Sequence, residues 1–241
     1  MIYFLHPVFL TLTIVLVVYS FLEVNNYKNY NSVWVAVAFL VVFIGLRYWV
    51  GADYPQYFRA YHNYSRDLSF SDIFGMVIEK NKRVDMEWLY ILLGKSLYEL
   101  GFSFYVFVFI IALIAIPIKY LAYSEHAVYP AFAFLLLLYP TILVSDGGQM
   151  RQGVAMSLIL FSFRYIKERK LIMFLFIMYI AMGFHTSAVV FIAAYWLVLI
   201  PMNSTRILVV VFISMVLSPL KLYQYFSLLD SLSSTGVYSG F

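Results

Sequence analysis

The sequence predicts an all-α protein: a polytopic transmembrane helical bundle of about eight spanning helices, with interfacial helices in a long extracytoplasmic loop. Hydrophobic residues make up 64% of the 241 residues and charged residues 12%, against roughly 45–50% and 25% in soluble domains. Apolar stretches occur along the whole chain. A spanning helix needs about 20 apolar residues to cross a core of about 30 Å. We therefore expect residues 1–241 to form a single membrane domain.

The charge balance fits a membrane protein. The net charge of +4 and the pI of about 9.0 reflect Lys and Arg at helix ends, where they meet anionic head groups. Membrane lipid is therefore the expected partner, and nucleic acid is not. The absence of cysteine excludes disulfides, thiolate metal sites and a cysteine nucleophile. The segment from Met1 to Leu22 lacks a basic start and a small-residue cleavage site, which predicts a retained helix.

The predicted spanning helices follow one another with mostly short polar connections. Their ends are placed at charged residues, glycine and proline, which terminate helices. In order, the spans are residues 3–22, 33–50 with Arg47 in the last turn, 102–120, 128–144, a helix from Arg151 to the basic cluster beginning at Arg164, then 171–183, 186–201 and 206–220.

One long polar segment interrupts this series. Residues 51–87 are rich in charged side chains and are predicted to carry short helices of their own. Residues 86–101 combine a leucine stripe with Lys95 and Glu99 on the polar side, which favours an interfacial helix over a crossing. We interpret residues 51–101 as an extracytoplasmic loop with amphipathic helices.

Orientation follows from the basic turn after the fifth span. Residues 164–170 contain four Lys and Arg in seven positions, so the positive-inside rule predicts a cytoplasmic turn. Even numbers of crossings separate the polar helix ends from one another. The sequence therefore predicts that the following residues share the extracytoplasmic face: Arg47, Asp53, Asp146, Arg151 and His185.

Two arginines on this face are candidate anion-binding residues. Arg151, flanked by Gln149 and Gln152, opens a helix after two glycines, where free N–H groups and the helix dipole attract anions. The alternative is a buried Arg151 paired with Asp146. Arg47 offers a forked donor for a phosphate or diphosphate. Its alternatives are an arginine that extends to the interface or pairs with Asp53.

His185 lies at a predicted helix break on the same face and is a candidate base or hydrogen-bond donor. A lone histidine is more often structural. The four histidines lack metal-ligand spacing, so we expect no metal and no other cofactor. The serines show no nucleophile elbow, which argues against a serine hydrolase.

The candidate residues fall within four motifs that resemble the EpsG family of bacterial exopolysaccharide and O-antigen gene clusters, which is similar in role to Wzy-type polymerases. The resemblance covers roughly residues 33–201, and the family chain usually continues further, so we expect this chain to be C-terminally incomplete relative to it. The motifs are Gly45-Leu46-Arg47 with Gly51-Ala52-Asp53-Tyr54 and Tyr57, Glu87-Trp88-Leu89-Tyr90, Met150-Arg151-Gln152-Gly153-Val154-Ala155, and Phe184-His185-Thr186-Ser187-Ala188.

The resemblance implies a polymerase of lipid-linked repeat units on the outer side of the bacterial cytoplasmic membrane. The donor and the acceptor would be glycans on undecaprenyl diphosphate, and chain-length regulator and flippase proteins would be possible partners. A metal-independent glycosyltransferase is then expected, with Arg151 and His185 as catalytic residues. The expected substrate-binding residues are Arg47, Asp53, Tyr54, Gln149 and Gln152, with Asp53 as the alternative base.

Two other functions stay open at this point. A transporter or flippase of a lipid-linked or anionic glycan would use the same arginines as a transient binding site, since transporters also contain broken helices with polar ends. A purely structural subunit of a synthase complex would tolerate substitutions on the polar face.

Overall fold

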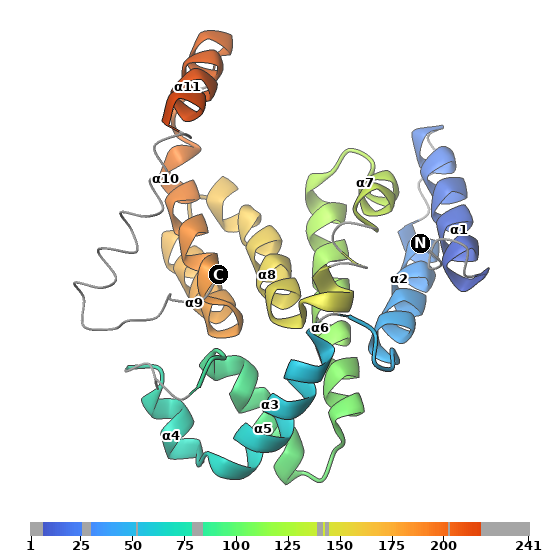
Figure 1. Ribbon diagram of the computed structural model, residues 1–241. Helices are drawn as coiled ribbons and strands as arrows, with labels where there is room; N and C mark the ends of the chain where they lie inside the picture. Colours follow the sequence, from blue (N-terminus) through green and yellow to red (C-terminus); the bar gives the residue numbers. More distant parts are fainter. Residues whose placement is uncertain are drawn as a thin grey trace. The chain divides into compact units, whose positions relative to one another are not determined.

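The computed structural model describes residues 7–25, 30–51, 53–78, 84–138, 142, 145–201 and 203–217 (Figure 1). Every regular element in these ranges is a helix, which confirms the all-α prediction. The chain divides into two compact units, Met1–Tyr195 and Trp196–Phe241. The first unit contains α1 (Pro7–Val24), α2 (Tyr30–Gly45), α3 (Tyr54–Asp67), α4 (Phe70–Gly75), α5 (Trp88–Glu99), α6 (Phe104–His126), α7 (Pro130–Leu137), α8 (Met150–Lys167), α9 (Leu171–Phe184) and the 3₁₀-helix η3 (Thr186–Ala193). Helix α10 (Ala194–Leu197) begins at the end of this unit, and α11 (Ser204–Leu217) belongs to the second.

Helix α6 connects the two apolar clusters that form the core of the first unit. One cluster joins α6 to α3, α5, α8 and α9, and the other joins it to α1, α2 and α7. Figure 1 shows α6 between α2 and α8, and it packs against both. The first turns of α6 supply Phe104 and Phe107 to one cluster, and its later turns supply Ile116 and Tyr120 to the other.

Among the described residues, α6 is the one helix whose length and apolar composition suit a membrane crossing. Its 23 residues extend about 35 Å at 1.5 Å per residue. Other apolar helices of 10–17 residues cover Leu10–Val24, Val33–Gly45, Leu171–Phe184, Thr186–Leu197 and Ser204–Leu217. The predicted number of spanning helices therefore stays a prediction.

Helix α2 is shorter than the sequence predicts. It ends at Gly45, so the placement of Arg47 inside a helix is wrong. Beyond this end the chain turns, and Trp49 (φ 52°) and Gly51 (φ 108°) both take positive φ, which a continuing α-helix does not allow. Arg47 Nη1 donates to the carbonyl of Ile44 at 2.8 Å and so satisfies one of the free carbonyls of the helix end.

The predicted helix over residues 186–201 is also different in the structure. Residues Thr186–Ala193 form a 3₁₀-helix, and only Ala194–Leu197 are α-helical. His185 is extended (φ −156°, ψ 119°) and ends α9, so the next helix begins anew at Thr186. The chain therefore changes from α9 to a tighter helix directly after His185.

Short helices α3, α4 and α5 lie within residues 51–101. A capping box between Ser69 and Asp72 begins α4. In α5, Lys95 pairs with Glu99 at 2.7 Å, but Lys95 is buried, whereas the sequence placed it on the polar side. The reason is a second acceptor: Lys95 Nζ donates to the carbonyl of Ser65 at 3.0 Å, which fastens α5 to α3.

A buried ion pair holds the segment that leads into α8. Lys119 of α6 and Asp146 lie 2.5 Å apart, and both side chains are almost fully buried. A charge of either sign at this depth is costly unless it is paired, so the pair fixes residues 145–148 against α6. The turn after α2 packs on the same segment: a Cβ at Gly51 would lie 2.9 Å from the carbonyl oxygen of Gly147.

Helices α5 and α9 approach each other closely at Gly183. A Cβ built on Gly183 would lie 2.8 Å from Leu89 Cβ and 3.2 Å from Trp88 Cε2. Since Leu89 Cβ is rigidly attached to the backbone, an added methyl group would force the helices apart. The absence of a side chain at Gly183 thus brings the start of α5 next to the end of α9.

We predict that Gly183→Ala lowers the thermal unfolding midpoint of the detergent-solubilised protein. Overpacking costs about 1–3 kcal/mol, and 1 kcal/mol corresponds to roughly 2–4 °C in a protein of this size. Gly75→Ala is the matched control, because nothing lies within 4 Å of a Cβ added there. Equal midpoints for the two variants would contradict the close α5–α9 contact.

Candidate functional site

One carboxylate joins three parts of the chain that are far apart in sequence. Glu87 Oε2 accepts a hydrogen bond from Arg151 Nη1 at 2.6 Å, and Glu87 Oε1 lies 3.0 Å from His185 Nδ1. Oε1 also accepts from the backbone N–H of Thr186 at 3.1 Å and from its hydroxyl at 3.4 Å. The exposed fractions of the side chains are 13% for Glu87, 16% for Arg151 and 28% for His185. The three side chains form a partly buried charge cluster.

Local structure explains how each group reaches this point. Glu87 is the residue before α5, and its extended backbone (φ −76°, ψ 147°) directs it away from the helix axis. Arg151 stands in the first turn of α8. His185 is extended (φ −156°, ψ 119°) between α9 and η3, so the backbone N–H of Thr186 faces Glu87 instead of continuing a helix. The cluster therefore occupies the meeting point of three helix ends.

Arg151 makes further contacts on this side of the molecule. Its Nη1 also donates to the carbonyl of Asp85 at 3.3 Å, and its guanidinium carbon lies 5.7 Å from the ring centre of Tyr57. Its Nε is buried and has no hydrogen-bond partner in the described part of the chain. The contacts to Glu87 and Asp85 fix the position of the guanidinium and leave its buried Nε–H unused.

Tyr90 lies within electrostatic reach of both arginines. Burial raises the pKa of the Tyr90 hydroxyl well above its ordinary value, while the positive charges of Arg151 and Arg47 act in the opposite direction. Burial also raises the pKa of the Tyr57 hydroxyl, and the charge of Arg151 partly offsets this increase. Arg47 also lies 5.9 Å from the ring centre of Tyr54. Arg47 and Arg151 thus both interact electrostatically with the buried residues Tyr57 and Tyr90.

Three buried donors in this region have no hydrogen-bond partner among the described residues: Arg47 Nε, Arg151 Nε and the Tyr90 hydroxyl. Buried polar groups are nearly always satisfied, so a group of unused donors requires an explanation. An anion with several oxygens, such as a phosphate, would satisfy donors of this kind, and arginine is the preferred side chain for it.

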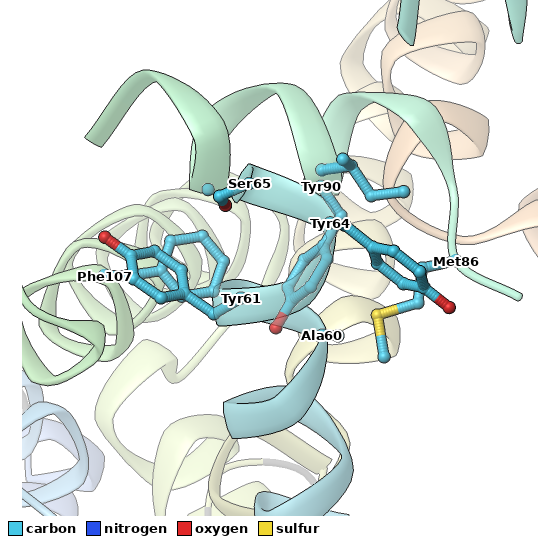
Figure 2. A pocket seen from close by; sticks show the side chains of 9 residues that line it. Ala60, Tyr61, Tyr64, Ser65, Met86, Tyr90 and Phe107 are labelled. Atoms are coloured by element: carbon cyan, nitrogen blue, oxygen red, sulfur yellow. The ribbon is translucent and has the colours of Figure 1, made fainter. Parts of the chain in front are cut away.

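The pocket in Figure 2 is a different feature. It lies beside Tyr90, between α3, α5 and α6, and has room for about one water molecule. It is lined by Ala60, Tyr61, Tyr64, Ser65, Met86, Tyr90, Ile91, Gly94 and Phe107. This void is too small for a sugar ring, and the pocket therefore belongs to the packing of α3 against α5.

The structure brings some of the sequence-predicted residues together and leaves others apart. Arg151 and His185 bind the same carboxylate, and Arg47 lies near them through the tyrosines. Tyr54 is buried, and its hydroxyl donates to the carbonyl of Arg47 at 3.4 Å. Within the described ranges, the side chains of three predicted residues make no hydrogen bond to the cluster: Asp53, Gln149 and Gln152.

Two alternative pairings considered from the sequence are wrong. Arg151 pairs with Glu87 and not with Asp146, whose partner is Lys119. Arg47 donates to Ile44 and forms no ion pair with Asp53 in the described part of the chain. Nothing in the sequence indicated Lys119 as a partner of Asp146, because Lys119 lies in an apolar helix far from Asp146 along the chain.

Sequence reasoning missed Glu87 and Tyr90 as site residues, although both stand in one of the four motifs that carried the resemblance. A signal for Glu87 was present: an acidic residue directly precedes an amphipathic helix in the loop that shares a face with Arg151 and His185. It could not be separated from the other charges of residues 51–87, because nothing in the sequence shows which of them is buried.

Glu87 is ionised at neutral pH. Burial alone would raise the pKa of its carboxyl group, but the hydrogen bond with His185, the charge of Arg151 and the backbone N–H of Thr186 lower the pKa from 4.5 to about 2. An ionised carboxylate accepts hydrogen bonds and donates none. Glu87 can therefore hold two cationic or N–H donors at once.

We predict that this carboxylate makes the fold sensitive to acid. Since the pKa of Glu87 is lower in the folded state, its stabilising effect is complete above about pH 4.5 and is lost as the pH falls toward about 2. The shift corresponds to roughly 3 kcal/mol. Thermal unfolding in detergent from pH 7 to pH 3 should show a smaller loss of stability for Glu87→Gln than for the wild type. Glu99→Gln is the control and should follow the wild type; a Glu87→Gln curve parallel to the wild type would contradict the assignment.

Comparisons with known proteins identify the family. The model of the EpsG family matches residues 30–239, which include Arg47, Glu87, Arg151 and His185. The comparisons with curated proteins and with solved structures found no match. This family supports a membrane protein of polysaccharide biosynthesis and suggests a polysaccharide polymerase-like function. Because the match covers most of the chain, the protein belongs to the EpsG family.

Proposed function

We propose that the protein is a polymerase that joins undecaprenyl-diphosphate-linked oligosaccharide repeat units into O-antigen or exopolysaccharide. The observation that carries this proposal is the Glu87 carboxylate shared by Arg151 and His185, beside buried donors that have no partner among the described residues. Family membership supports the polymerase class. The cluster supplies what such a reaction needs: positive charge for a diphosphate and a group that can take a proton.

The donor diphosphate would bind to the arginines. Arg151 stands at the N-terminus of α8, where the free N–H groups and the helix dipole favour anions. The unused donors of Arg47, Arg151 and Tyr90 would satisfy further phosphate oxygens. As the glycosyl–oxygen bond breaks, negative charge grows on the diphosphate, and fixed positive groups lower the energy of that state.

His185 would act on the acceptor. A hydroxyl oxygen of the acceptor glycan attacks the anomeric carbon of the donor, undecaprenyl diphosphate leaves with the bonding electron pair, and the hydroxyl proton passes to His185. Asp53 is the alternative base. A diphosphate is already a good leaving group, so positioning and charge neutralisation would supply most of the rate. The reaction is proposed to be metal-independent, because the arginines neutralise the charge.

The membrane arrangement is part of the proposal. A multi-pass protein of the bacterial cytoplasmic membrane, with the charge cluster on its outer face, agrees with the basic turn after α8 and with an even number of crossings between the polar ends. Helix α9 has only 14 residues, or about 21 Å. A helix this short would draw the end that holds His185 below the head groups, where ionisable side chains are usually functional.

A transporter or flippase is the second candidate function. The observation that favours it is the break between α9 and η3 at His185, since transporters bind substrates at broken helices. Purified protein in detergent with lipid-linked repeat units separates the two functions. Polymer formation without a membrane to cross, in the presence of a chelator, supports the metal-independent polymerase. Absence of polymer, with transport of the same substrate in vesicles, would favour the transporter.

We predict that Arg151→Ala and His185→Ala each reduce polymer formation by at least about 100-fold, the usual cost of removing a group that stabilises charge in the transition state. The measurement is polymer amount and chain length in cells, at equal protein levels. Arg59→Ala and His62→Ala are the matched controls, because both side chains lie exposed on α3, and both should leave the polymer unchanged. Normal polymer in the Arg151 and His185 variants would refute their assigned roles.

A further inference from the structure

We infer that Glu87 is a positioning residue that fixes the ring tautomer of His185, with the proton on Nδ1 and the lone pair on Nε2, while it holds the guanidinium of Arg151. The part of this inference that concerns catalysis rests on the proposed function. The part that concerns the histidine ring rests on the geometry alone.

The tautomer follows from what Glu87 can accept. Its Oε1 lies 3.0 Å from His185 Nδ1, and an ionised carboxylate has no proton to donate. The pKa of Glu87, about 2, keeps this carboxylate ionised at neutral pH. Nδ1 must therefore carry the proton that forms this hydrogen bond. In the neutral ring, Nε2 then carries the free lone pair, and a general base needs such a lone pair to accept a proton.

Nε2 is available because no described residue forms a hydrogen bond with it. The His185 ring is 28% exposed, and among the described residues its one hydrogen bond is the bond at Nδ1 to Glu87. The backbone of His185 is held at the end of α9 by its N–H, which donates to the carbonyl of Ala181 at 2.9 Å. One nitrogen is thus fixed by the protein, and the other is left for a substrate hydroxyl.

Glu87 itself is unsuited to act as the base. Its two oxygens accept from Arg151, His185 and two groups of Thr186, and a base with such a low proton affinity removes protons poorly at neutral pH. The carboxylate instead connects the first turn of α8 to the break after α9. Loss of its charge would release Arg151 and His185 together.

The side-chain length of Glu87 matters as well as its charge. Both oxygens are in use at the same time, with Arg151 on one and His185 and Thr186 on the other. Aspartate keeps the charge but is one methylene group shorter. Its carboxylate can therefore contact Arg151 or His185, but not both at the same time. Glutamine keeps the length but replaces one accepting oxygen with an NH₂ donor. This NH₂ group would point at a donor of either Arg151 or His185, and two donors repel each other.

The test measures the tautomer and the activity separately. Nitrogen chemical shifts of ¹⁵N-histidine-labelled protein in detergent, at a pH where imidazole is neutral, distinguish the two tautomers. The chain has four histidines, and the His185 signals are those absent from His185→Asn. We expect the Nδ1–H form of His185 in the wild type and in Glu87→Asp, and a larger share of the Nε2–H form in Glu87→Gln. An Nε2–H form in the wild type would overturn the inference.

The activity measurements use the same proteins in detergent with lipid-linked repeat units. Glu87→Gln is expected to reduce polymer formation by at least about 100-fold, since loss of the carboxylate that orients a catalytic histidine can cost up to about 10⁴. Glu87→Asp should recover at least tenfold relative to Glu87→Gln. Glu99→Gln is the control for the same change in an ion pair of α5, and its rate should stay within twofold of the wild type.

The outcomes separate this inference from the proposed function. A wild type with the Nδ1–H form but without polymer would refute the polymerase and leave the positioning of the ring intact. An active wild type with an equally active Glu87→Gln would refute the positioning role and leave the polymerase intact. If Glu87→Gln fails to elute as a single folded species, Glu87→Asp carries the test: a rate equal to that of the wild type would refute the need for both contacts.

Discussion

The candidate site depends on one group, the Glu87 carboxylate, which accepts hydrogen bonds from both Arg151 and His185. A partly buried charge is stable only when it is paired and hydrogen-bonded, and Glu87 satisfies this requirement with partners from two other helix ends. The contact is possible because Gly183 lets α5 approach α9. Without Glu87, Arg151 would be a positive charge at a helix start and His185 an unconstrained ring at a helix break. With it, the two side chains have fixed positions relative to each other.

A second buried ion pair, Lys119 with Asp146, stabilises the fold next to the candidate site. It holds the segment before α8 against α6, and the turn at Gly51 packs directly on that segment. This arrangement brings Arg47 near the tyrosines that also face Arg151. Lys119 donates to one oxygen of Asp146. Among the described residues, the other oxygen of Asp146 has no hydrogen-bond partner, and neither do Arg47 Nε, Arg151 Nε and the Tyr90 hydroxyl.

Family membership indicates the general class of protein, and the geometry of the charge cluster bears on its chemistry. Membership of the EpsG family supports a membrane protein of polysaccharide biosynthesis. The charge cluster adds a chemical rationale for the proposed reaction, because it combines the fixed cation of Arg151 with a histidine whose Nε2 makes no hydrogen bond to any described residue. Arginines that hold a diphosphate and a histidine that takes a proton need few other groups, since the leaving group is already activated. The exposed fraction of His185 is compatible with access by a substrate hydroxyl.

The sequence by itself determined the helical class, the short helices between residues 51 and 101, and the importance of Arg151 and His185 as candidates, because hydrophobic periodicity, charge position and helix ends are local properties. It also placed Arg47 and Tyr54 in the same region. Only the tertiary structure decided that Glu87 is the residue that joins Arg151 to His185, that Asp146 belongs to Lys119, and that Lys95 is buried against α3. Each of these depends on which helices lie side by side, and the partner of a charge is chosen by proximity in space, which no short stretch of sequence records.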